Sequence, residues 1–307
     1  RSNAQGVVRR ASALSGLAVA DTLIRCAQDF GEAEGRVALQ SLQSLADDLN
    51  EPAALDALLN RLPKSSVTLR KFAAGLSRRI VATLPGDDRS PEARVFMARS
   101  LHKLANRLSE LGDRQGALVP VREAVEIRRE LAANSPDTFR PDLASSLNNL
   151  AAFLSELGEL QGALAPAREA VTIYRELAAN TLDAHRPDLA TSLNNLAIHL
   201  SELGDRQGAL TPAREAVNLY RELVAHNPNV FRPGLAMSLN TLVNCLSEPG
   251  DRQSASALAR EAVEIHRELA ATNPDAFRPN LAISLNTLAT QLRNRGDWQG
   301  ALAPTHE

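Results

Sequence analysis

Aromatic residues are scarce in this sequence. Phe, Tyr and Trp make up 3% of its 307 residues, although hydrophobic residues as a whole make up 44%. Any core must therefore be built mainly from Leu, Ala, Val and Ile, which is typical of packed helices. The composition predicts a helical protein whose core contains few rings.

Cysteine and net charge are also low. The two cysteines, Cys26 and Cys245, are far apart in sequence and match no disulfide or metal-binding spacing, which favours a reducing, cytoplasmic location. A net charge of −2 gives no reason to expect nucleic acid or an anionic membrane surface as a partner. No apolar run approaches the roughly 20 residues of a membrane span, and no signal peptide is visible.

Catalytic motifs are missing as well. The sequence contains no Gly-Lys dipeptide of a P-loop, and it has no HExxH, CxxC or G-x-S-x-G motif. Its histidines occur singly, and we expect them, including His199 and His266, to lie on solvated surfaces. Carboxylates recur at repeated positions, which is unusual for an active site. We therefore predict no enzymatic activity, no metal site and no cofactor.

The sequence does contain an internal repeat. SELGDRQGAL at 109–118 recurs unchanged at 201–210, SELGELQGAL occupies 155–164, and weaker copies follow at 247–256 and 293–302. The central glycines are Gly112, Gly158, Gly204, Gly250 and Gly296, at intervals of 46 residues. A register kept without insertion through all the copies indicates a repeat architecture.

Each copy is predicted to form two helices. In the second copy, the leucines between 143 and 154 recur every three to four residues, which is typical of one helix face. Gly158 is suited to end this helix, and a second helix is predicted from Leu160. A polar connector follows, and Pro187 marks the start of the next copy. Stacked hairpins bury the faces that a single hairpin leaves exposed, so the pattern predicts an all-α, right-handed solenoid of antiparallel helix hairpins.

The spacing of small and large residues resembles the tetratricopeptide repeat. The second copy reads L-x2-L-A-x2-L at 147–154 and A-x3-A-x2-A at 163–170, with Leu and Ala in place of the family's aromatic residues. The 46-residue period and the LNNLA phrase are similar to the extended repeats of kinesin light chain, over roughly residues 94–307. The resemblance implies a scaffold that binds a protein or peptide in a groove lined by the outer face of each first helix.

Asparagine recurs inside the predicted first helices, although it is a mediocre helix former. One column of equivalent positions reads His102, Asn148, Asn194, Asn240 and Asn286. The neighbouring columns differ more between copies, so we interpret the amides as kept for hydrogen bonding. Two readings stay open: the amides contact the main chain of a ligand, or they contact the adjacent repeat and fix its register.

The predicted groove combines these amides with charged residues on the same helix face. The groove residues are Asn148, Asn194, Asn240, Asn286, Asn149, Asn195, Arg99, His102, Lys103, Asn106, Glu156, Glu202 and Asn244. Only the first copy clusters the cations that could grip a terminal carboxylate. The middle copies carry Glu at the rim, and this favours a neutral or basic ligand segment there.

Three parts of the chain are predicted. Residues 1–4 are interpreted as a cloning remnant, residues 5–93 as an N-terminal helical cap or degenerate repeats outside the 46-residue register, and residues 94–307 as an array of five units, the last one truncated. The favoured function is a scaffold for a protein or peptide partner. The alternative is a sensor or regulatory arm of a larger multidomain signalling NTPase or protease-like effector, with another domain of the same chain as partner. Neither nucleic acid nor a membrane is expected as a partner.

Overall fold

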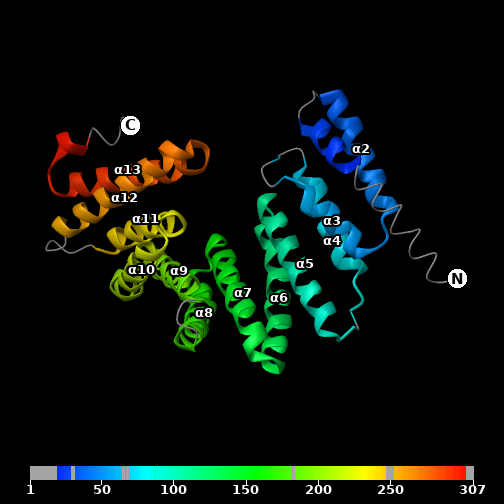
Figure 1. The fold of residues 1–307 in the computed structure, drawn as a ribbon, viewed down its shortest axis with the longest axis horizontal. Helices are drawn as coiled ribbons and strands as arrows, with labels where there is room; N and C mark the ends of the chain where they lie inside the picture. Colours follow the sequence, from blue (N-terminus) through cyan, green and yellow to red (C-terminus); the bar gives the residue numbers. More distant parts are fainter. Residues whose placement is uncertain are drawn as a thin grey trace. The chain divides into compact units, whose positions relative to one another are not determined.

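Helices make up the regular structure of the protein. A computed structural model describes residues 19–28, 32–63, 66, 69–86, 88–180, 184–246 and 252–301, and no strand occurs within these ranges (Figure 1). The helices are α2 (Glu32–Asp48), α3 (Pro52–Arg61), α4 (Arg70–Thr83), α5 (Pro91–Glu110), α6 (Arg114–Asn134), α7 (Pro136–Glu156), α8 (Leu160–Asn180), α9 (Arg186–Glu202), α10 (Arg206–His226), α11 (Pro228–Cys245), α12 (Arg252–Thr272) and α13 (Pro274–Asn294). Residues 19–28 are helical too. The predicted all-α class is confirmed.

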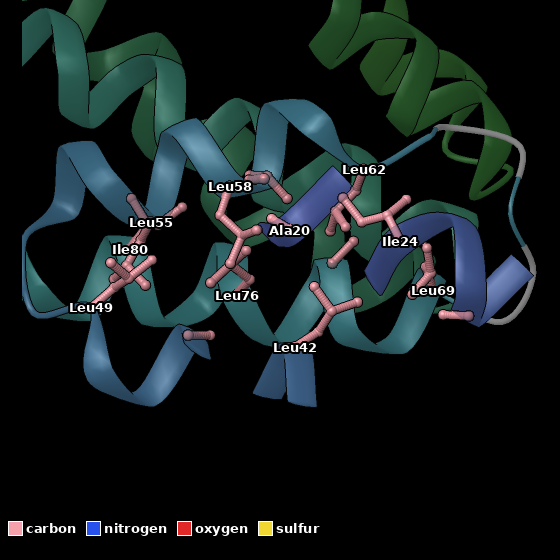
Figure 2. Close-up of a cluster of buried hydrophobic side chains, with 14 of the residues drawn as sticks. Ala20, Ile24, Leu42, Leu49, Leu55, Leu58, Leu62, Leu69, Leu76 and Ile80 are labelled. Atoms are coloured by element: carbon pink, nitrogen blue, oxygen red, sulfur yellow. The ribbon is translucent and has the colours of Figure 1, made fainter. Parts of the chain in front are cut away.

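The chain divides into two compact units, residues 1–140 and 141–307. In the first unit, α2, α3 and α4 enclose an apolar cluster (Figure 2). Leu42 comes from α2, Leu55 and Leu58 come from α3, and Ile80 comes from α4; each is at most 1% exposed. Burying a side chain of this size stabilises the folded state by about 2 kcal/mol, so these contacts hold the N-terminal helices together.

The second unit is a stack of helix hairpins. From α8 to α13, each helix packs against the next one in the sequence, and the first helices of successive repeats, α9, α11 and α13, also contact one another (Figure 1). Small side chains recur on these first helices: Ala144, Ala190 and Ala236 occupy equivalent positions and are 0% exposed. The predicted solenoid of helix hairpins is therefore confirmed.

Glycine ends the first helix of the repeats, as the sequence predicts. Gly158 has φ +81°, and Gly112, Gly204 and Gly296 are likewise in the left-handed region. This conformation is open to glycine without a Cβ penalty, and it turns the chain into the second helix. Gly250 lies outside the described residues.

The connectors between repeats are more helical than the sequence analysis predicts. Helices α7, α11 and α13 begin at Pro136, Pro228 and Pro274, so much of the predicted polar connector is helical and Pro141, Pro233 and Pro279 lie inside these helices. A first-turn proline lacks only an N–H that has no helical partner, and its fixed φ suits a helix start. The third copy has Leu182 at the equivalent sequence position, and its helix α9 begins only at Arg186, with Pro187 in the first turn.

One helix before residue 94 carries leucines at the 46-residue spacing, and the division at residue 93 stays a prediction. Leu55, Leu58 and Leu62 of the α3 region precede three leucines of α5 by 46 residues each, and all are buried. Asn60 likewise precedes Asn106 by 46 residues. The polar residues around this pattern differ from the later copies, which hides the register in the sequence.

Arginine–glutamate pairs link the helices within and between hairpins. Arg232 near the start of α11 lies 2.6 Å from Glu268 near the end of α12, and Arg186 pairs with Glu222 in the preceding hairpin. A second kind of pair joins the second helices of successive repeats, with Arg221 of α10 2.9 Å from a carboxylate oxygen of α12. Exposed pairs of this kind contribute at most about 1 kcal/mol each, so they supplement the apolar packing.

Two glycines of the second repeat should respond to alanine in opposite directions. Gly158→Ala places a Cβ in the left-handed region and is expected to lower the free energy of unfolding by about 1–2 kcal/mol. Gly162→Ala is the matched control, because Gly162 is helical and an added Cβ would meet nothing closer than 3.9 Å. It is expected to raise that free energy by roughly 0.5 kcal/mol. Urea denaturation measures both changes, and a stabilising Gly158→Ala would contradict the prediction.

Candidate functional site

The first helices of the repeats present a face on which most of the described residues are exposed or half-buried. We define the A face by the positions equivalent to 145, 149, 152 and 156. Its members in the second unit are Ser145, Asn149, Ala152, Glu156, Thr191, Asn195, Ile198, Glu202, Met237, Thr241, Asn244, Ile283, Thr287, Thr290 and Asn294. Most are exposed or half-buried, except Thr241 and Thr287. Met237 and Ile283, at the position equivalent to 145, are 49% and 60% exposed.

The asparagine column lies beside this face, between adjacent first helices. Asn148 of α7 donates from Nδ2 to Ser192 Oγ of α9 at 2.6 Å, and Asn240 of α11 donates to Ser284 Oγ of α13 at 2.7 Å. The amide hydrogen bonds therefore reach the next repeat, which is the second of the two readings open in the sequence. Ligand contact by this column stays a prediction.

Asparagines of the column are buried where a further repeat packs on their helix and exposed where none is described. Asn194 and Asn240 are 5% and 7% exposed, whereas Asn286 of the last first helix is exposed. The Oδ1 atoms of Asn148, Asn194 and Asn240 are buried without a hydrogen-bond partner in the described part of the chain. Ser238, which faces Asn194 by the same register, also has a buried Oγ without a partner. The structure therefore has no hydrogen bond between Asn194 and Ser238, the middle pair of the Asn–Ser series.

A buried histidine is hydrogen-bonded to the serine of the last Asn–Ser pair, Asn240–Ser284. His266 of α12 is 1% exposed, and its Nδ1 lies 2.7 Å from Ser284 Oγ. Because Ser284 accepts from Asn240, its own hydroxyl proton is available to donate to His266 Nδ1, which suits a neutral ring. Burial lowers the pKa of His266 accordingly.

The expectation that the histidines are solvated is wrong for His199 as well. It is 6% exposed on α9, and burial lowers its pKa, partly opposed by Glu202 at 3.6 Å from Nδ1. Glu202 itself remains 45% exposed and accepts a hydrogen bond from Ser155 Oγ of α7. A signal of burial was available in the repeat column of His199, because the equivalent residues Phe153 and Cys245 are apolar, and both are buried.

The second asparagine column divides in two. Asn149 and Asn195 of the A face are half-buried. Thr241 and Thr287 replace them in the next two copies, and each threonine hydroxyl donates to the carbonyl four residues earlier in its own helix. Asn244, one helical turn further along α11, is exposed.

The predicted cations of the first copy take part in ion pairs within the first unit. Lys103 Nζ lies 2.7 Å from Oδ1 of the buried Asp56 on α3, and Arg99 lies 3.8 Å from Oδ2 of the same residue. Arg107 pairs with Glu110 at 2.8 Å on its own helix. Asp56 precedes His102 by 46 residues, so it occupies the asparagine column of an earlier helix. Asn106 is exposed and His102 is half-buried.

The sequence analysis missed the serines that accept the amide hydrogen bonds. Their column reads Ser100, Ser146, Ser192, Ser238 and Ser284. It is identical in all five copies, and every member is at most 2% exposed. A small hydroxyl repeated two residues before each asparagine position was the available signal. It indicates that this side of the helix meets the preceding repeat.

The described residues show neither a membrane-spanning helix nor a metal-binding cluster. None of their helices combines the length and the apolar character needed to cross a membrane. No group of three or more His, Cys, Asp or Glu side chains among them could hold a metal ion.

Comparison with known proteins identifies similar repeats and similar folds. A family model described as Tetratricopeptide repeat matches residues 97–137, 143–179, 189–228 and 235–274. The crystal structure of BtubC (BKLC) from P. vanneervenii is 20% identical, covers 80% of this chain and 87% of that chain, and has a TM-score of 0.57. The apo form of RapI is 16% identical, with coverages of 95% and 74% and a TM-score of 0.57. A Rap protein complexed with Competence and Sporulation Factor is 14% identical, with the same coverages and a TM-score of 0.55. No protein with a curated description matches.

The asparagine column offers a matched pair of variants. Asn240→Ala is expected to lower the free energy of unfolding by about 1–2 kcal/mol, because it removes a buried hydrogen bond. Asn286→Ala, at the equivalent but exposed position, is expected to change it by less than about 0.5 kcal/mol. Urea denaturation followed by circular dichroism measures both. Equal losses from the two variants would show that the contact between repeats does not depend on this amide.

The stability of the first unit should depend on pH through His102. Burial, with a smaller contribution from Arg128, lowers the pKa of His102 from 6.5 to about 4. Between these values the unfolded chain binds a proton that the folded chain does not. Above pH 6.5 His102 is neutral in both states and does not lower the free energy of unfolding. As the pH is lowered toward 4, the free energy of unfolding falls by up to about 3 kcal/mol.

Urea midpoints recorded from about pH 7.5 to pH 4.5 test this dependence. His102→Asn is the matched variant, because the later copies carry Asn at this position. It is expected to flatten the pH profile. A variant profile parallel to the wild type would assign the pH dependence to other groups.

Proposed function

The chain belongs to the tetratricopeptide repeat family, and we propose that it is a protein-interaction scaffold whose A face binds a segment of another protein. The observation that carries this proposal is the exposure of Met237 and Ile283 at the same position of two adjacent first helices. Large apolar side chains repeated on one exposed face are typical of an interaction surface. They lie among amides and hydroxyls that can both donate and accept hydrogen bonds.

The columns of the repeat divide by role in this proposal. The alanine, serine and asparagine columns that recur between copies meet adjacent helices, as Asn148 and Asn240 do through their hydrogen bonds. The column containing Met237 and Ile283 differs in every copy and is exposed in each. Recurring columns hold the array together, and varied columns supply the side chains that distinguish one partner from another.

The predicted groove residues have two different roles in this proposal. The exposed or half-buried polar residues of the A face, Asn149, Asn195, Asn244, Glu156 and Glu202, are proposed to make polar contacts with the partner. Asn286 has no further described helix on it and is proposed to do the same. The Nδ2 atoms of Asn148 and Asn240 already donate to the next repeat, so these two residues are proposed to act by orienting adjacent helices.

The test compares partners retained by variants of the full chain. Met237→Lys/Ile283→Lys places two charges on the A face at exposed positions, so the melting temperature should stay within about 2 °C of wild type. Val119→Lys is the matched control, because Val119 is a 70% exposed apolar residue on a second helix, α6. Proteins that co-purify are identified by mass spectrometry.

Under the proposal, the A-face variant loses at least one partner by tenfold or more, and Val119→Lys keeps it. Identical partner sets for both variants, at unchanged stability, would show that the A face is not the binding surface.

A further inference from the structure

The A face of the second unit is uneven in chemistry, and the unevenness specifies a partner. We propose that this face binds an extended segment with two apolar side chains three residues apart, which contact Met237 and Ile283, and a lysine or arginine about six residues from the side chain at Met237. This inference rests on the proposed function and adds the chemical class of the partner segment.

The apolar part of the face lies on α11 and α13. Met237 and Ile283 are equivalent residues on these helices, which pack against each other. Packed helices have axes about 8–10 Å apart, so the two side chains are separated by about that distance. Ile198 on the adjacent α9, at the position equivalent to 152, is also apolar and is half-buried.

An extended segment fits this spacing. In polyproline II conformation the rise is about 3.1 Å per residue with three residues per turn, so residues i and i+3 lie on one side about 9 Å apart. A β-strand places residues i and i+3 on opposite sides. The polyproline II backbone makes no internal hydrogen bonds, and the amides of Asn195 and Asn244 on the same face can satisfy it.

An amphipathic helix is a poorer match for the same face. A helix presents an apolar stripe at least about 100° wide that must be covered. The A face offers only two large, exposed apolar residues on its four helices in the second unit, with Ser, Thr and Asn around them. This apolar surface can accommodate two apolar side chains of a partner, but its polar surroundings do not match the apolar stripe of an amphipathic helix.

The charge of the face has one sign. Among the described A-face residues of α7, α9, α11 and α13, the charged ones are Glu156 and Glu202, and none is Lys or Arg. The side chain of Glu202 is 45% exposed. Its neighbour His199 is kept neutral by burial, so it does not compensate the carboxylate charge. A cationic residue of the partner is therefore favoured at this end of the face.

The relative position of the charge and the apolar pair follows from helix geometry. Glu202 occupies the position equivalent to 156 and Met237 the position equivalent to 145, so they differ by eleven residues, or about 16 Å, along the helix direction. The two helices are adjacent, which adds about 9 Å across. The diagonal is about 19 Å, the length of about six residues in polyproline II conformation.

The experiment selects ligands without assuming their sequence. Random twelve-residue peptides displayed on phage are selected on the intact chain, and enriched peptides are synthesised with a fluorophore. Their affinities are measured by fluorescence anisotropy for the wild type and three variants: Met237→Lys/Ile283→Lys, Glu156→Lys/Glu202→Lys, and the control Val119→Lys. The expected consensus has two apolar residues three apart and a basic residue about six positions from one of them.

The variants separate the possible outcomes. The inference expects each A-face double variant to weaken these peptides at least tenfold, and Val119→Lys to leave them within twofold. Peptides that depend on the A face but are acidic, or that carry apolar residues at helical i, i+7 spacing, would overturn the inference and leave the proposed function standing. Peptides insensitive to both A-face variants, or no enriched peptide at all, would overturn the inference and the proposed function together.

Discussion

Close contact between the first helices of successive repeats is the constraint on which the second unit depends. Ala144, Ala190 and Ala236 are completely buried, one helical turn before the asparagine column that forms hydrogen bonds to the next repeat. A larger side chain there would separate the helices, and overpacking of this kind typically costs about 1–3 kcal/mol. The equivalent Ala282 on the last described first helix is exposed, because no further described helix packs on it. Burial of an alanine at this position of the repeat therefore indicates that a further repeat packs on that helix.

Two amides in this interface are hydrogen-bonded across it. An amide taken out of water costs free energy unless it is hydrogen-bonded, and the serine column supplies the acceptors for Asn148 and Asn240. The geometry is directional, so it fixes the rotation and register of adjacent helices in a way that alanine contacts alone do not. The same arrangement brings Ser284 to His266 and makes a buried polar group of three residues from three different helices.

What remains exposed after these contacts form is the A face. Its exposed members lie one or more residues away from the buried columns on the same helices, and exposure leaves their side chains free to differ between copies. This explains why Ser145, Thr191, Met237 and Ile283 are equivalent in position and unlike in chemistry. In the first unit, by contrast, Asp56 of α3 engages Lys103 and Arg99, so the cations of α5 contribute to packing within that unit.

The sequence by itself determined the helical class, the 46-residue hairpin period and the glycine that turns each first helix into the second, because these depend on local spacing and on conformations open only to glycine. Tertiary structure decided which side of the first helix meets a neighbour. Adjacent residues of a helix differ by 100° in direction, so Asn148 lies against the next repeat and Asn149 lies on the A face, although both are asparagines. The burial of His199 and His266 and the ion pair at Asp56 were decided in the same way, since each depends on a helix distant in sequence.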